Sequence, residues 1–240
     1  MEADYAKHKT QNTKHKTRML KHILFDNDGT IVDSEIIAVR STLQLLKEHG
    51  LTLDEQTYSK RFPGLLERDI LAILKTEYGV EVGPDYFERL RKLHHDGFAQ
   101  NLRVIPGMAG LFRALRTPRS MVSNGSVRHV EYCLRRVRLR SALDGQIFSA
   151  EHVENPKPHP DVYQYALDQL GLQANDTVVV EDSPTGVQAA KAAGIRVVGF
   201  LGAAHIHDGH DEKLLERGAD FIAEDAKALH KIFLQLGAAF

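Results

Sequence analysis

The 240-residue sequence has one cysteine, no tryptophan and eight prolines, and its charges nearly cancel. The single thiol, at Cys133, cannot form an intrachain disulfide, and a metal site built from cysteine pairs is excluded as well. The net charge of -1 indicates no broad basic surface for nucleic acid or an anionic membrane. Apolar runs are far shorter than the roughly 20 residues of a membrane span, and no secretory signal opens the chain. We therefore expect a cytoplasmic protein without nucleic-acid or membrane partners.

The composition that remains is typical of a globular protein, with 42% hydrophobic and 26% charged residues. At about 150 residues per domain, the length predicts one domain, or one domain with an insert. Nothing in these numbers indicates an obligate assembly, so we expect a monomer.

Basic residues are concentrated at the N-terminus. Residues 1–22 contain six Lys or Arg and two acids, so this segment carries about +4 and the remainder about -5. A basic arm of this kind can contact RNA, anionic lipid or a protein partner, but it has almost no apolar periodicity and no interleaved aromatic residues. We interpret residues 1–20 as a basic, disordered leader.

Short apolar runs alternate with helical patterns from residue 23 onward. Buried strands are predicted at residues 23–25, 121–122, 178–180, 195–200 and 221–222. Ser126 is a candidate N-cap for one of the intervening helices, and Pro160 and Pro184 stand where two others would begin. Strands that alternate with helices predict an α/β fold with a Rossmann-like, doubly wound parallel sheet.

One stretch interrupts this alternation. Residues 34–103 contain no convincing strand, only helical stripes of apolar residues. We predict an all-helical insert at 34–103, within a core formed by residues 21–33 and 104–240. The two crossing segments, near residues 32–33 and 103–106, would form a hinge.

Polar side chains follow three of the predicted strands directly, and one more lies in a connecting loop. They are Asp26, Asp28, Ser123, Asn124, Lys157, Glu181 and Asp182. Because ligands of wound parallel sheets bind beyond the carboxyl ends of the strands, we expect these side chains to meet at one edge. Clustered carboxylates repel one another unless a cation holds them, and hard oxygen ligands suit Mg²⁺. The sequence therefore predicts a magnesium site.

The same set of residues fits a phosphoryl group. One of the two aspartates, Asp26 or Asp28, can attack while the other handles protons, and Ser123 and Lys157 add a hydroxyl donor and a positive charge. Taken singly, each signal is more often a solvated turn, a helix start or a surface lysine. Their common position at strand ends favours phosphoryl chemistry instead.

Four motifs make the chain resemble the haloacid dehalogenase superfamily, in its helical-cap phosphatase and phosphomutase branch, over about residues 21–236. They are ILFDNDGT at 23–30, MVSN at 121–124, KPHPD at 157–161 and VVEDSPTG at 179–186. The resemblance implies that Asp26 attacks phosphorus, and that Asp28 protonates the leaving oxygen and then activates water. Ser123, Asn124 and Lys157 would bind the phosphoryl group.

The resemblance also implies a Mg²⁺ cofactor and a helical cap at 34–103. The ion would be held by the Asp26 carboxylate, the Asp28 backbone carbonyl and Asp182, with Glu181 in or just outside the coordination sphere. Capped relatives place a substrate-reading loop around the position of Gly64, so Arg61 or Arg68 would contact the substrate; a solvated helix face is the alternative.

Asp28 separates this chain from dehalogenases and phosphonate hydrolases, which lack an acid/base at its position. We therefore expect a phosphatase of small phosphorylated metabolites, similar to bacterial sugar-phosphate and 6-phosphogluconate phosphatases. Mutase relatives carry a His near the place of Ala38 and a Lys at the place of Pro63, and both are missing here. A β-phosphoglucomutase-like mutase and a non-catalytic binding protein on the same fold are the alternatives. The motifs do not identify the substrate.

Two further features are interpreted as structural. The histidine run His205–His210 lacks the spacing of a helical metal site, so we expect a mobile polar loop. Cys133 has no evident base or activating charge near it in the sequence, and we expect it to serve packing only.

Overall fold

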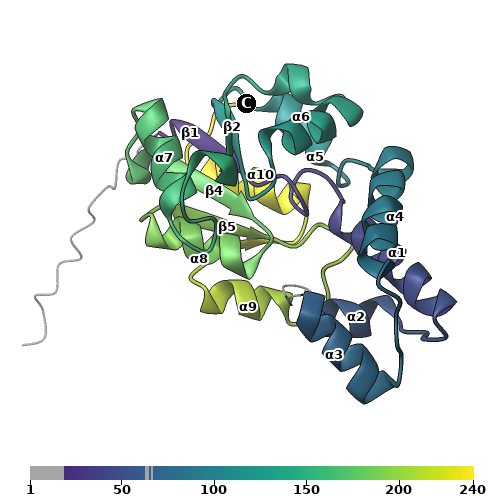
Figure 1. Ribbon diagram of the computed structural model, residues 1–240. Coiled ribbons are helices and arrows are strands. Elements are labelled where there is room, and N and C mark those ends of the chain that lie inside the picture. The colour runs from purple at the N-terminus through teal and green to yellow at the C-terminus, as the bar shows by residue number, and fades with distance from the viewer. Residues whose placement is uncertain (1–18, 63–64, 66) are drawn as a thin grey trace, which may run out of the picture.

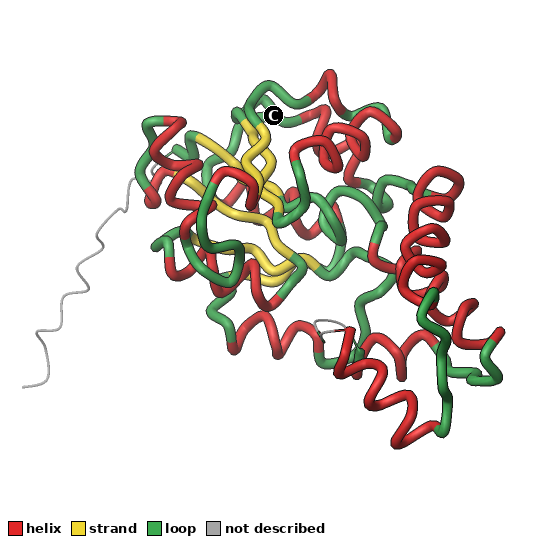
Figure 2. Tube along the Cα trace, viewed as in Figure 1, coloured by secondary structure: helices red, strands yellow, loops and turns green. Residues whose placement is uncertain are grey.

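The computed structural model describes residues 19–62, 65 and 67–240, and these form a parallel six-stranded sheet covered by helices, with a helical segment at one side (Figures 1 and 2). The strand order is β3-β2-β1-β4-β5-β6. The strands are β1 (His22–Phe25), β2 (Arg119–Ser123), β3 (Ile147–Ser149), β4 (Thr177–Glu181), β5 (Arg196–Phe200) and β6 (Phe221–Ala223). The predicted α/β, doubly wound sheet is thereby confirmed.

All five predicted strands are present, but β3 was not predicted. This strand has only three residues, Ile147 to Ser149, and pairs with β2 alone at the edge of the sheet. β6 has the same length and was predicted, so length alone does not account for the omission of β3.

The helices of the sheet domain lie on both faces. They are α5 (Met108–Ala114), α6 (Val127–Arg136), α7 (Asp161–Leu170), α8 (Pro184–Ala192), α9 (His210–Glu216) and α10 (Ala226–Gln235). Alternate residues of β1 point to opposite faces: Phe25 packs with Phe112 and Phe233 on one, and Leu24 joins the cluster of α7 and α8 on the other. Each face of the sheet thus has its own hydrophobic core.

Helix starts follow the expected chemistry. The Ser126 side chain accepts a hydrogen bond from the His129 backbone N–H and caps α6, and Pro184 is the first residue of α8. Both details were predicted. Pro160 is the N-cap of α7. These caps fix where the helices leave the carboxyl edge of the sheet.

The described residues between β1 and α5 form four helices: α1 (Glu35–Glu48), α2 (Glu55–Arg61), α3 (Glu67–Tyr78) and α4 (Tyr86–Asn101). The described residues of this helical segment contain no strand. Leu45, Leu46, Phe62, Leu74 and Tyr86 form a hydrophobic cluster of its own. The segment therefore has its own small core, beside that of the sheet.

The two chain crossings into the helical segment are paired with each other. Val32 and Val104 form an antiparallel bridge, and the Asp33 N–H donates to the Arg103 carbonyl at 2.9 Å. The Ile105 N–H donates to the Ile31 carbonyl at 3.0 Å. The helical segment is thus joined to the sheet through one short, two-stranded connection.

Some predictions fall on residues that lie outside the described ones. The basic leader is among them except for residues 19 and 20, and so are Pro63 and Gly64. Within the described ranges, none of the helices has the length and apolar character needed to cross a bilayer.

Candidate active site

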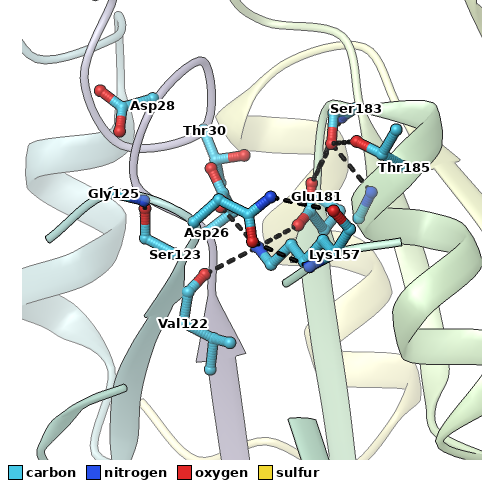
Figure 3. A network of polar contacts seen from close by, with 12 residues as sticks. Asp26, Asp28, Thr30, Val122, Ser123, Gly125, Lys157, Glu181, Ser183 and Thr185 are labelled. Carbon is cyan, nitrogen blue, oxygen red and sulfur yellow. Dashed lines mark hydrogen bonds and ion pairs between the residues drawn. The ribbon is translucent and has the colours of Figure 1, made fainter. Parts of the chain in front are cut away.

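A buried ion cluster lies where β1, β2 and β4 end (Figure 3). The Lys157 ammonium donates to Asp26 Oδ1 at 2.7 Å, to Glu181 Oε1 at 2.6 Å and to the Val122 carbonyl at 2.8 Å. Parallel pairing of β1 with β2 and β4 aligns the carboxyl ends of these strands and so brings these groups together. The expected meeting of distant motifs at one sheet edge is observed.

Glu181 forms the floor of this cluster. Its side chain accepts hydrogen bonds from the Tyr163 hydroxyl at 2.9 Å and the Ser183 hydroxyl at 3.0 Å, and it is fully buried. A Cβ at Gly186 would lie 1.9 Å from Glu181 Oε1, so only glycine fits there. The glycine of the fourth motif therefore makes room for the carboxylate.

Asp182 is held by groups from three separate segments. The Thr30 hydroxyl donates to Asp182 Oδ1 at 3.0 Å, and His205 Nε2 lies 3.3 Å from Oδ2. The Asp182 backbone carbonyl accepts a hydrogen bond from His210 Nε2 at 2.6 Å. Gly29 has φ +79°, and a Cβ there would lie 2.0 Å from the Asp182 carboxylate, so the turn after β1 also requires glycine.

Carboxylate oxygens of Asp26, Glu181 and Asp182 lie within 4.8 Å of one another, and all three residues are buried. Burial raises the pKa of Asp26 well above its usual range, and Glu181 and Asp182 raise it further while Lys157 opposes them. Burial disfavours the charge of Lys157, but Asp26 and Glu181 outweigh it and raise the pKa of Lys157. Three acids face one ammonium, so the cluster can hold a cation.

Asp28 points away from this cluster, as Figure 3 shows. Its carboxylate accepts hydrogen bonds from the Ser34 hydroxyl at 2.7 Å and from His129 Nε2 at 3.0 Å. Burial opposes ionisation of Asp28, but these hydrogen bonds outweigh it and lower the pKa of Asp28. The same contact raises the pKa of His129 to about 10. The Asp28 carboxylate is thus held as the acceptor of a charged pair.

Ser123 is the last residue of β2 and Asn124 follows it, and the two side chains play different parts. Ser123 Oγ accepts from the Gly125 N–H at 2.9 Å and keeps its own hydrogen to donate. The Asn124 side chain accepts from the Lys157 N–H at 2.9 Å and donates to the Lys157 carbonyl at 3.1 Å. Asn124 therefore fixes the backbone that carries the lysine.

These groups open into a cavity of about 710 Å³. Its lining includes Asp26, Asp28, Ser123, Asn124, Lys157 and Asp182 from the predicted set, whereas Glu181 lies behind it. The helical segment contributes Glu35, Val39 and Ser59, and a loop and helix after β5 contribute His205, His207, His210 and Lys213. A polar ligand with an anionic end fits this lining.

Arg61 and Arg68 are not brought to the cavity. The Arg61 side chain pairs with Glu77 and its guanidinium lies 5.5 Å from the centre of the Tyr78 ring. The Arg68 side chain is 80% exposed and lies 3.4 Å from Asp69. Both arginines pair within the helical segment, Arg61 with an acid of the next helix and Arg68 with its neighbour in the sequence.

Sequence reasoning missed the histidines of the site. The run His205–His210 was expected to be a mobile polar loop, but His205 and His210 bond Asp182 and their side chains are largely buried. Cys133 was expected to have no base nearby, yet its Sγ lies 3.6 Å from His129 Nε2. The sequence held a signal for each contact. The loop with His205 follows the predicted strand β5, and His129 lies in the first turn of the helix that Ser126 caps.

Comparison with known proteins agrees with this geometry. A family model described as haloacid dehalogenase-like hydrolase matches residues 23–200. The 6-phosphogluconate phosphatase of Escherichia coli K12 is 28% identical over 187 residues, which cover 78% of this chain and 85% of the relative. The phosphorylated carbohydrates phosphatase of Thermotoga maritima is 28% identical over 219 residues, which cover 88% and 97%.

A solved structure is similar over nearly the whole chain. It is a HAD family hydrolase from Deinococcus radiodurans R1 with bound phosphate and sodium, 30% identical, with a TM-score of 0.85 and coverage of 92% of this chain and 97% of that one. The resemblance that the four motifs indicated is confirmed. With its strand-end acids, its sheet order and a family match over most of its length, the chain belongs to the haloacid dehalogenase-like hydrolases.

Proposed function

We propose that this chain is a Mg²⁺-dependent phosphatase that hydrolyses small phosphorylated metabolites, sugar or sugar-acid phosphates, through an aspartyl-phosphate on Asp26. The observation that carries the proposal is the buried contact of Asp26 with Lys157 at the floor of the cavity. A carboxylate oxygen beside a fixed ammonium is suited to meet a phosphoryl group, because the cation offsets charge on the phosphoryl oxygens as the bond forms. The similarity to phosphatases of phosphorylated carbohydrates supports the substrate class.

The residues present fit a magnesium ion. Asp26, Glu181 and Asp182 carry three acids against the single ammonium of Lys157, an excess of negative charge that a divalent cation offsets. Asp26 and Asp182 would hold the ion together with the Asp28 backbone carbonyl, with Glu181 in or just outside the coordination sphere. When bound, Mg²⁺ would supply positive charge that keeps Asp26 ionised and neutralises phosphoryl oxygens.

The chain's own groups divide the chemistry between them. Asp26 attacks phosphorus and forms the acyl-phosphate, while the ester bond to the leaving oxygen breaks. Asp28 passes to that oxygen the proton that His129 holds beside it, then takes one from the water that hydrolyses the acyl-phosphate. Ser123 donates its hydroxyl to a phosphoryl oxygen, Lys157 offsets the phosphoryl charge, and Asn124 holds the Lys157 backbone in place.

The helical segment serves as a cap in this proposal. Residues 34–103 would close over the site formed by residues 21–33 and 104–240 and exclude water while the acyl-phosphate forms. Glu35, Val39 and Ser59 would then contact the part of the substrate beyond the phosphate.

The test is release of phosphate from a panel of sugar phosphates, sugar-acid phosphates and phosphoglycolate by the full chain with Mg²⁺. We expect release from at least one ester, and a loss of at least about 10³-fold in Asp26→Asn, because the nucleophile is gone. Asp168→Asn, an exposed aspartate on α7, is the matched control and retains activity.

Two results would overturn the proposal. Isomerised sugar phosphate without free phosphate would make the chain a mutase. No turnover of any ester would make it a binding protein on the same fold.

A further inference from the structure

A second group of metal-ligating atoms lies beside the candidate active site. Asp28, His129 and Cys133 each offer one ligand atom, and these atoms all lie within 4.8 Å of one another. His129 Nε2 is 3.0 Å and 3.2 Å from the two Asp28 oxygens and 3.6 Å from Cys133 Sγ. His129 and Cys133 are four residues apart on α6, so they project from one face of the helix.

This set of atoms suits a different ion from the carboxylate cluster. An imidazole nitrogen, a thiolate and one carboxylate oxygen are ligands that Zn²⁺ takes, whereas Mg²⁺ is bound by oxygen. Zinc bonds of about 2.0–2.3 Å at tetrahedral angles put neighbouring ligand atoms roughly 3.3–3.8 Å apart. The contacts of His129, at 3.0 to 3.6 Å, already approach that spacing, so binding requires little movement.

The neighbours of the cluster hold its members in place. The Ser34 hydroxyl donates to Asp28 Oδ1, and the Phe98 ring packs edge-on against the His129 imidazole with centroids 6.0 Å apart. Such groups around a ligand fix its orientation and strengthen metal binding. Asp28 lines the cavity and is partly exposed, while Cys133 is fully buried behind it, so an ion would enter past the carboxylate.

We propose that Asp28, His129 and Cys133 form a separate site for a thiophilic divalent cation, Zn²⁺, whose occupancy switches the phosphatase off. The thiol proton and the proton between His129 and Asp28 pass to solvent as the ion binds. The inhibitory effect rests on the proposed function: an Asp28 carboxylate bound to zinc can neither protonate the leaving oxygen nor activate water. Substrate binding at Asp26 and Lys157 would be affected much less.

Cobalt reports on the site without any activity measurement. The full chain, with Mg²⁺ in excess to fill the oxygen cluster, is titrated with Co²⁺ and followed by absorption. We expect a thiolate-to-cobalt charge-transfer band that saturates at one ion per chain and disappears when Zn²⁺ is added. Cys133→Ser should lose the band, and His129→Gln should bind Co²⁺ at least about tenfold more weakly. His95→Gln, at an exposed histidine on α4, is the control and should keep the charge-transfer band.

Circular dichroism establishes that each variant is folded before it is compared. His129→Gln keeps the thiol, so it tests the site even where Cys133→Ser fails to fold. Absence of the band in the folded wild-type chain, or its persistence in folded Cys133→Ser, would overturn the proposed site.

The second arm measures phosphate release with Mg²⁺ saturating and Zn²⁺ varied. Zn²⁺ should lower kcat with little change in KM, and Cys133→Ser should need at least about tenfold more Zn²⁺ for half-inhibition, relative to its own activity in Mg²⁺ alone. Equal inhibition of both proteins would place the zinc at the carboxylate cluster and overturn the proposal. A cobalt band in a chain that hydrolyses no ester would instead support the site and refute the proposed function.

Discussion

The sheet edge and the helical segment 34–103 contribute to the same cavity in different ways. At the sheet edge, Asp26, Asp182 and Lys157 each have partners from segments far apart in the sequence. In the helical segment, the cations Arg61 and Arg68 bond to acids of that segment and leave the cavity lining to Glu35, Val39 and Ser59. The contrast teaches that ion pairs between distant parts of the chain are concentrated at the strand ends, while the arginines of the helical segment pair locally.

The largest effect expected from this contrast is at Lys157. Lys157→Met leaves Asp26 and Glu181 buried without their cation, so the free energy of unfolding should fall by about 3–5 kcal/mol. Phosphate release should fall below about one thousandth, because the phosphoryl charge is no longer offset. Urea unfolding, monitored by circular dichroism, measures the free energy of unfolding, and a phosphate assay measures the activity. Lys227→Met, at an exposed lysine of α10, is the matched control. Equal losses of stability and of phosphate release in both variants would show that neither depends on the ion pairs of Lys157.

A smaller effect is expected in the core of the helical segment. Leu74 is fully buried there, so Leu74→Ala should lower its stability by about 2–5 kcal/mol through the cavity it creates. Hydrogen exchange should show α3 and α4 losing protection while β4 keeps it, because the segment has its own core. Leu71→Ala, on the same helix but exposed, should change little. Equal loss of protection in β4 would mean that the two regions unfold as one unit.

In the sheet, we expect the free energy of unfolding to depend on pH through His22. Burial lowers the pKa of His22 from 6.5 to about 4, so the unfolded chain takes up a proton there before the folded chain does. The free energy of unfolding should therefore fall as pH drops from 6.5 towards 4, by up to about 3 kcal/mol from this residue. Urea titrations at several pH values should show a shallower slope for His22→Gln than for the wild type. An unchanged slope would remove His22 as the cause.

The smallest effect is expected at Arg61. Arg61→Ala removes a cation that bonds Glu77 and does not line the cavity, so KM should change by less than about twofold. Lys213→Ala, which removes a cation from the lining, should raise KM more. Steady-state kinetics on the preferred ester measures both. A tenfold rise in KM for Arg61→Ala would mean that Arg61 contacts the substrate after all.

The sequence was sufficient for the sheet because its strands are continuous apolar runs, such as Val178 to Val180, bounded by polar turns. It did not reveal β3, an edge strand of three residues, although β6, which has the same length and also lies at an edge, was predicted. The candidate site was predictable to the same degree: Asp26, Ser123 and Asp182 lie at or just after the ends of strands, so the parallel sheet itself brings them together, while Lys157 comes from a connecting loop.

The contacts that the sequence could not decide depend on packing between elements. Arg61 sits on a helix surface, and nothing in its neighbourhood in the sequence says whether that surface faces the cavity or Glu77. His129 reaches Asp28 only because α6 returns across the end of β1, a contact between residues 101 positions apart. His205 could have been found, because the strand-end argument applies to β5 as it does to β1, β2 and β4.

The paired connection at Val32 and Val104 has a consequence for how such a protein can be altered. Both ends of the helical segment leave the sheet domain at one place, held by the Asp33 to Arg103 hydrogen bond. A replacement segment whose ends lie equally close could be grafted between these two positions without disturbing the order of the strands. The same sheet domain could in this way carry different inserted segments beside its cavity.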